Sequence, residues 1–259
     1  MSLGNGIRFI WLDAHIGRDN EYDQFKKKFS QALEPTTVMP PDQIDSLICA
    51  LNENAAPFLF ADTISKALFL IQEHHDKHIY FISSGSLGEQ VIPYIKRVYP
   101  QVHQFYIFCG LQSNYFDLVV ENSSCLQIFT SELDLLVRLT RDISKCIIKQ
   151  GEVYLNLHSA IDALKCFESA EKLEVTANQV DTLNDPALII LKSLRGYGDN
   201  IGLIQRAKEM NTEQQHSHPA GANAPNPEPR TENEDATGYS ASAANNDDDP
   251  IAEEDSGGQ

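Results

Sequence analysis

The sequence lacks the cysteine spacing of a zinc site or of a disulfide framework. Its five cysteines are an odd number among 259 residues, and none belongs to a CxxC pair. They lie far apart, several within apolar segments: Cys49, Cys109, Cys125, Cys146 and Cys166. Because disulfides are rare in the reducing cytosol, we expect buried, reduced thiols and no metal centre.

Long apolar segments are also missing. No run approaches the roughly 20 apolar residues that a membrane-spanning helix needs. The first residues, MSLGNGIRF, contain no apolar signal segment. We therefore expect a cytoplasmic protein that does not enter a membrane.

Basic residues are scarce, with 20 Lys and Arg against 37 Asp and Glu, and the net charge is −17. Residues 211–259 hold 11 of the acids and one base, Arg230, and so carry −10 of that charge. This balance argues against nucleic acid and anionic membranes as partners. The final segment is rich in Asn, Pro, Ala, Ser and Gly, which predicts a disordered acidic tail over residues 209–259.

What the sequence does contain is an alternation of short apolar segments with amphipathic stretches between Ile7 and Ile148. Five segments are predicted strands: Ile7–Leu12, Phe58–Phe60, Ile79–Ile82, His103–Cys109 and Cys125–Phe129. The stretches between them carry apolar residues three and four apart, which is typical of helices. We predict an α/β domain over residues 5–149, a five-stranded parallel sheet that is flavodoxin- or receiver-like with strand order 2-1-3-4-5.

The central strand leads into a Gly/Ser-rich stretch, HIYFISSGSLG at His78–Gly88. Parallel sheets bind ligands at the carboxyl ends of their strands, and helix N-termini favour anions. The candidate anion site comprises Asp13, Ser83, Ser84, Gly85, Ser86 and Gly88. GxGxxG and Walker patterns are absent, so two structural alternatives stay open: the Ser/Gly stretch only turns and caps the helix, and Asp13 only caps a turn.

Three segments resemble a domain found repeatedly in bdelloid rotifer proteins: IWLD at Ile10–Asp13, FISSGSLG at Phe81–Gly88 and FYIFC at Phe105–Cys109. The resemblance covers about Ile7 to Lys149. Proteins with this domain often append tetratricopeptide repeats or an arginine ADP-ribosyltransferase domain. The resemblance implies a receiver-like fold and no assigned activity.

Phosphoryl chemistry of the response-regulator type needs several groups that this sequence lacks. Such receivers use acids after the first strand, an Asp ending the third, a Thr or Ser ending the fourth and a Lys ending the fifth. Here Asp13 has no adjacent acid, Ser83-Ser84-Gly85 ends the third strand, Cys109-Gly110 the fourth and Thr130-Ser131 the fifth. Without Mg²⁺ ligands and the Lys, the transferring charge is not neutralised, so we predict no phosphorylation.

Two further features invite a functional interpretation. Glu89 follows the Gly/Ser stretch and could serve a Toll/interleukin-receptor-like NAD hydrolase, although its place early in a helix is explained by the helix dipole. The histidines of HHDKH, His74, His75 and His78, suggest a metal site, but their spacing at a helix-to-strand connection favours a solvated loop.

The pattern changes after Ile148. Five residues, Gly151, Tyr154, Ala163, Phe167 and Ala170, have the spacing of one tetratricopeptide repeat over residues 147–174. The small residues would let two antiparallel helices approach, with Tyr154 and Phe167 filling the gap. We predict a helical segment over residues 150–208, including a helix from Asp185 to about Lys208 interrupted at Arg195–Asn200.

The leading hypothesis is a non-enzymatic, intracellular adaptor that needs no cofactor. The receiver-like sheet would bind a protein partner or a small anionic ligand, and the helical hairpin would provide a second protein contact. The alternative is a nucleotide sensor or hydrolase of the NAD type that uses the SSGSLG stretch.

Overall fold

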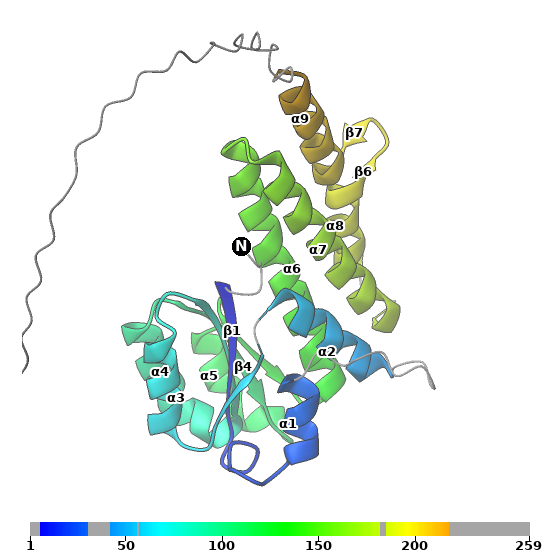
Figure 1. Ribbon diagram of the computed structural model, residues 1–259. Coiled ribbons are helices and arrows are strands. Elements are labelled where there is room, and N and C mark those ends of the chain that lie inside the picture. Colours follow the sequence, from blue (N-terminus) through cyan, green and yellow to red (C-terminus); the bar gives the residue numbers. More distant parts are fainter. Residues whose placement is uncertain (1–5, 31–41, 56, 182–184, 218–259) are drawn as a thin grey trace, which may run out of the picture. The chain divides into compact units, whose positions relative to one another are not determined.

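Five parallel strands form the centre of the fold, in the order β2-β1-β3-β4-β5 (Figure 1). The strands are β1 Ile7–Leu12, β2 Leu59–Ala61, β3 His78–Ser84, β4 Val102–Phe108 and β5 Leu126–Phe129. The computed structural model describes residues 6–30, 42–55, 57–181 and 185–217; the predicted tail beyond residue 217 lies outside them. The predicted fold class and strand order are confirmed.

The central strand is longer than its apolar residues predict. Ser83 and Ser84, expected in a turn, complete β3 by pairing with Ile107 and Phe108 of β4. Helix α4, Gly85–Val98, begins at the next residue. The small residues therefore join strand to helix without an intervening loop.

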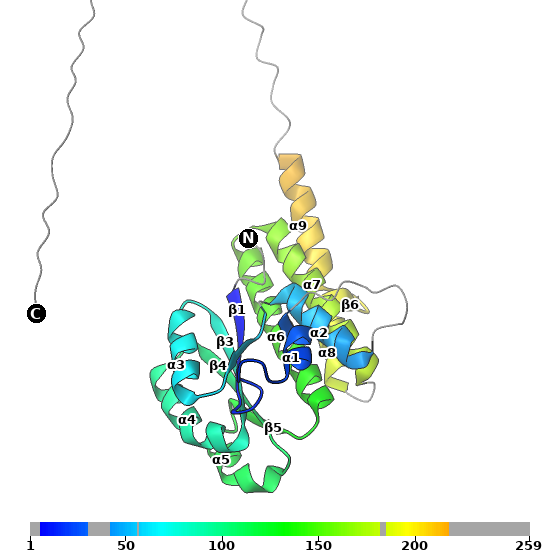
Figure 2. The ribbon, with the colours of Figure 1, turned by 60° about the horizontal axis from the view of Figure 1, so that its bottom comes forward.

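One face of the sheet is covered by α1 (Asp23–Ser30), α2 (Gln43–Asn54) and α6 (Glu132–Asn156) (Figure 2). Its core is aromatic: the rings of Phe9 and Phe58 stack with centroids 4.2 Å apart, and Trp11 meets Phe29 edge-on at 5.7 Å. Such ring pairs add to the free energy gained by apolar burial. The apolar core on this face is the larger of the two, because it continues into the helices beyond the sheet.

The opposite face is covered by α3 (Ile64–Glu73), α4 and α5 (Phe116–Glu121), the last preceded by a short 3-10 helix, η2, at Gln112–Tyr115. Aliphatic side chains dominate there, including Ile10, Ile79 and Ile92. Alternate residues of each strand point to opposite faces, so β3 contributes Tyr80 and Ile82 to one core and Ile79 and Phe81 to the other.

Helix starts follow side-chain caps. Asp42 and Ser131 accept the backbone N–H groups of Asp45 at 2.7 Å and Asp134 at 3.3 Å. The first helix starts at Asp23. Asn20 and Tyr22 have φ angles of +64° and +54°, outside the right-handed helical region, so a regular helix cannot begin before Asp23.

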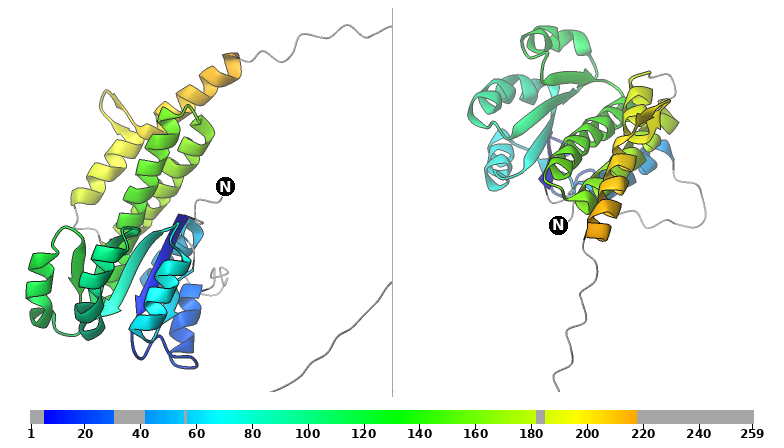
Figure 3. Two further views of the ribbon diagram at one scale, coloured as in Figure 1. Left: turned by 90° about the vertical axis from the view of Figure 1, so that its left-hand side faces the viewer. Right: turned by 90° about the horizontal axis from the view of Figure 1, so that it is seen from above.

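Helix α6 extends 25 residues and crosses the predicted domain boundary at 149/150 without a break (Figure 3). It forms an antiparallel pair with α7, Ala160–Val180, and α2 contacts both helices. The described residues between 6 and 217 accordingly form one compact unit.

The chain after α7 follows the predicted pattern with a longer final helix. Helices α8 (Asp185–Arg195) and α9 (Leu203–Ser217) flank a two-stranded hairpin, β6 Gly196–Tyr197 and β7 Asn200–Ile201, and both helices pack on α7. The interruption predicted at Arg195–Asn200 is this hairpin. Helix α9 continues past Lys208 into residues predicted as tail, because Ala207 and Met210 pack against the shared core.

Within the described ranges, no helix has the length and apolar character needed to cross a bilayer. The five cysteines are free thiols, but only Cys166 is buried, whereas the other four are partly exposed. Burial raises the pKa of Cys166 to about 11.

We expect Gly151→Ala to destabilise the protein by about 1–3 kcal/mol, although Ala is the better helix former by about 1 kcal/mol. A Cβ at this position would lie 2.6 Å from Cε1 of Phe167 and 2.9 Å from Cβ of Cys166, so α6 and α7 would have to separate. Urea denaturation measures the change. Gly110→Ala is the control, since nothing lies within 4 Å of its Cβ position. An unchanged or higher midpoint for Gly151→Ala would contradict this packing.

Glu174→Gln should stabilise the protein at neutral and alkaline pH. Glu174 is fully buried between α6 and α7, and burial raises its pKa, an effect that Ser144 and Arg141 only partly offset. Above the ordinary Glu pKa the unfolded chain releases this proton more readily, so the wild type loses stability as pH rises. The urea midpoint of the variant should exceed that of the wild type near pH 8. The difference between the two midpoints should shrink as the pH is lowered toward about 4. The exposed control Glu168→Gln should have the wild-type midpoint at both pH values. The same result for Glu174→Gln would contradict the prediction.

Candidate functional site

The residues of the predicted anion site lie at the carboxyl ends of β1 and β3. Leu12 pairs with Ser83, so the next residues, Asp13 and Ser84, stand side by side at this edge. Gly85, Ser86 and Gly88 form the beginning of α4. The sheet therefore brings the predicted residues to one end, but each of them makes different contacts.

Asp13 shapes the turn after β1. Its Oδ1 accepts the backbone N–H groups of His15 at 2.8 Å and Ile16 at 3.0 Å. The Asp13 carbonyl accepts the N–H of Gly17 at 2.9 Å, and Gly17 lies so close to β2 that a Cβ would come within 2.2 Å of the Ala61 carbonyl. These contacts agree with the turn-capping alternative for Asp13.

Ser83 lies beneath α4 and away from solvent. The residue is completely buried, and its Oγ is 2.4 Å from the position that a Gly88 Cβ would take. No group of the described ranges hydrogen-bonds this hydroxyl. Gly88 is thus explained by the close approach of helix and strand.

The start of α4 is covered by an aromatic ring. Ser84 occupies the N-cap position without a side-chain cap bond. A Cβ on Gly85 would lie 2.1 Å from Cζ of Tyr115, so the phenol of this η2 residue packs directly against the glycine. A phosphate could reach Gly85 from this side only if Tyr115 moved.

The other predicted features also have structural positions. Ser131, after β5, caps α6. Glu89 is exposed and is the fifth residue of α4, later than the second or third position expected, so it lies beyond the first turn.

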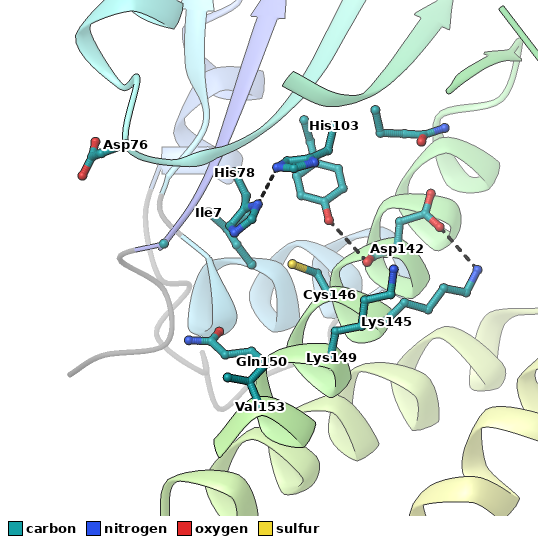
Figure 4. Close-up of a pocket in the computed structure, with 13 residues that line it drawn as sticks. Ile7, Asp76, His78, His103, Asp142, Lys145, Cys146, Lys149, Gln150 and Val153 are labelled. Carbon is teal, nitrogen blue, oxygen red and sulfur yellow. Dashed lines mark hydrogen bonds and ion pairs between the residues drawn. The ribbon is translucent and has the colours of Figure 1, made fainter. Parts of the chain in front are cut away.

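A different site lies at the amino end of the sheet (Figure 4). A cavity of about 730 Å³ separates the first residues of β1, β3 and β4 from α6. Its size is in the range of small-molecule sites. The lining combines cationic, imidazole, thiol and apolar groups: Gly6, Ile7, Asp76, His78, Tyr80, His103, Gln104, Asp142, Lys145, Cys146, Lys149, Gln150 and Val153.

Two histidines face each other across neighbouring strands in this cavity. Nδ1 of His78 is 2.5 Å from Nε2 of His103, a hydrogen-bonding distance at which one of the two nitrogens donates and the other accepts. The strand register places Ile79 opposite Val102 but Tyr80 opposite Gln104, which leaves His103 as the extra residue of a β-bulge. Bulges re-aim side chains, and here the bulge brings His103 beside His78. His78 is exposed, as predicted, but it is the first residue of β3, so its assignment to a loop is wrong.

Asp142 of α6 is the best-connected carboxylate of the cavity. It accepts the Tyr106 hydroxyl at 2.9 Å and Arg138 Nε at 2.8 Å, and Lys145 Nζ lies 3.4 Å away. Burial and the adjacent carboxylate raise the pKa of Tyr106, so the phenol remains a donor. Asp142 is consequently neutralised by its own neighbours.

Lys149 places a positive charge near the histidine pair. Burial, His78 and Lys149 all lower the pKa of His103. Burial raises the pKa of the Cys146 thiol, a change that Tyr80 and Lys149 partly counter. Figure 4 shows Cys146 and Lys149 projecting from α6 toward the sheet. Among the described residues, no His, Cys, Asp and Glu side chains form a group of three or more suited to a metal ion.

Sequence reasoning missed this cavity because its residues are far apart in the chain. His78 and His103 are separated by 25 positions, and Lys145 and Lys149 belong to the later helix α6. One signal was present: His103 begins a predicted strand, His78 immediately precedes another, and these two strands are neighbours in the order 2-1-3-4-5. The bulge that aligns them has no comparable signature in the sequence.

Comparison with family models, curated proteins and solved structures finds no match to this chain in any of the three. The function is therefore argued from the geometry of the two sheet edges and of the exposed surface.

His103→Asn should make the protein less sensitive to mild acid. With a lowered pKa in the folded state, His103 takes up its second ring proton less readily than the unfolded chain does. Wild-type stability should therefore fall as pH drops below the ordinary His value of about 6.5, until the lowered pKa of His103 is passed.

The measurement is the urea midpoint at about pH 7.5 and about pH 5.5. The drop between these values should be smaller for His103→Asn than for the wild type. His75→Asn, an exposed histidine outside the cavity, is the matched control. Parallel drops for all three proteins would argue against a proton-sensitive pair.

Proposed function

We propose that this chain is a non-enzymatic adaptor that binds a protein partner. The observation that carries the proposal is the closed carboxyl edge of the sheet. Asp13 is held in its own turn, Ser83 is buried beneath α4, and Tyr115 covers Gly85. Doubly wound sheets place their ligands and reacting groups at this edge. Occupation of the edge by the chain's own side chains favours a binding role over catalysis there.

The exposed surface supplies a contact region for such a partner. Leu111, Phe116 and Val120 are 60%, 67% and 58% exposed, around α5 and beside the edge strand β5. A hollow of about 420 Å³ lies among Gln112, Ser113, Phe116, Val119 and Ile128. Exposed apolar groups gathered in one region are typical of protein contact sites. We call Leu111, Phe116 and Val120 the α5 surface.

The helical hairpin offers a second contact in this proposal. Val153, Leu157 and Ile161 are exposed at the turn between α6 and α7. The resemblance of residues 147–174 to a tetratricopeptide repeat supports a role in protein binding, because stacked repeats of that family form binding surfaces. The resemblance of Ile7–Lys149 to the bdelloid rotifer domain stays a prediction.

Phe116→Ser should abolish partner recovery without lowering the melting temperature. Phe69→Ser is the matched control: Phe69 is 63% exposed, but it lies on α3. Affinity capture from the organism's own cells, compared by mass spectrometry, should recover the same partner with the wild type and with Phe69→Ser. Equal recovery with Phe116→Ser would exclude the α5 surface.

The same preparations test for catalysis. The adaptor proposal expects no turnover of NAD, ADP-ribose or ATP and no labelling by acetyl phosphate. Turnover that disappears in Asp13→Ala or Glu89→Ala, with the melting temperature unchanged, would replace the adaptor with an enzyme.

A further inference from the structure

We propose that the cavity at the amino end of the sheet binds a small organic anion, with its carboxylate or phosphate group between Lys149 and the His78–His103 pair. This goes beyond the proposed adaptor function and concerns the opposite edge of the sheet. The ligand would be a compact molecule with an apolar body, since Ile7 and Val153 supply apolar walls and the cavity holds about 730 Å³.

The charge of the lining supports an anion. Two lysines face the cavity, and both of its carboxylates are neutralised from outside the lining. Asp76 pairs with Lys77 at 2.7 Å and Asp142 with Arg138 at 2.8 Å. Lys145 Nζ lies 3.4 Å from the same Asp142 carboxylate. Among the ion pairs of the described residues, none joins a carboxylate to Lys149. The lining itself holds two aspartates and two lysines, and the positive excess of this region comes from Lys77 and Arg138 beside it, in a chain of net charge −17.

The histidine pair supplies directional hydrogen bonding. With one proton shared between Nδ1 of His78 and Nε2 of His103, the neutral pair keeps one N–H donor and one acceptor on its outer nitrogens. A further proton makes both outer nitrogens donors and gives the pair a positive charge. An anion would stabilise this form, so binding should be coupled to proton uptake.

Several charged or titratable groups surround the pair and determine that coupling. They come from α6, from β3 and from the turn before β3: Asp142, Lys145, Cys146, Lys149, Tyr80 and Asp76. The Lys149 charge and burial oppose protonation of His103 in the free protein. A bound anion next to Lys149 would compensate both effects, so affinity should rise as pH falls.

The test uses the full chain and four probes: inorganic phosphate, phenyl phosphate, benzoate and the neutral benzamide. Isothermal titration calorimetry should show binding of benzoate or phenyl phosphate and none of benzamide. The ratio of the two affinities identifies the anionic group, and binding of inorganic phosphate alone would remove the apolar body from the proposal. Side-chain ¹⁵N signals of His78 and His103 should shift on binding, which places the ligand in the cavity.

Two variants distinguish binding in the cavity from nonspecific attraction of the anion to exposed lysines. Lys149→Gln should weaken binding about tenfold, the loss expected for one charge-assisted hydrogen bond. Lys172→Gln removes an equal charge from exposed α7 outside the cavity and should change nothing. Equal weakening by both variants, or no binding of any anionic probe, would overturn the proposal.

The pH arm uses benzoate, whose charge is constant between about pH 6 and pH 8. Wild-type affinity should increase toward pH 6, and His103→Asn should lose this increase. Benzoate affinity that is independent of pH, with unchanged histidine signals, would remove the pair from the site. Circular dichroism of each variant confirms that a loss of binding is not a loss of fold.

Discussion

The fold depends on the packing of one helix, α6, against two different neighbours. Its first half covers the aromatic face of the sheet, and its second half packs against α7. Close approach at Gly151 is what lets the Phe167 ring fit between the two helices. Because the apolar cluster is continuous from β1 to α9, the sheet and the helical segment are stabilised by shared burial. The cavity at the amino end borders the same helix, so its lysines are held by that packing.

The architecture could be predicted because it depends on local patterns. Strand β1 has the predicted bounds Ile7–Leu12, and the other four strands differ from their predicted bounds by one or two residues at an end. The caps Asp42 and Ser131 sit where short polar side chains precede apolar periodicity. The strand order followed from the alternation of strands and helices. Errors arose where tertiary contacts overrule local preference: Ser83 and Ser84 extend β3 because β4 offers partners to their backbone.

The functional candidates were less accessible to sequence reasoning. A Ser/Gly stretch after a strand has the same composition whether it cradles a phosphate or lets a helix approach. Tyr115, which decides between these outcomes at Gly85, lies 30 positions away in a short 3-10 helix. The histidine pair depends on a bulge, and the cavity acids Asp76 and Asp142 matter only through the cations that neutralise them. Such features arise from register and pairing, which periodicity alone does not encode.

The contact of α2 with α7 has a consequence for the order of synthesis. Helix α2 ends at Asn54, yet part of its apolar face is covered by α7, which begins at Ala160. A ribosome therefore releases more than 100 residues, by the numbering of these elements, before that covering helix exists. During this interval the nascent chain holds uncovered Leu and Ile side chains, the kind of surface that chaperones bind. Helix α2 therefore cannot finish folding when the sheet forms, because α7 must first be synthesised and packed against it.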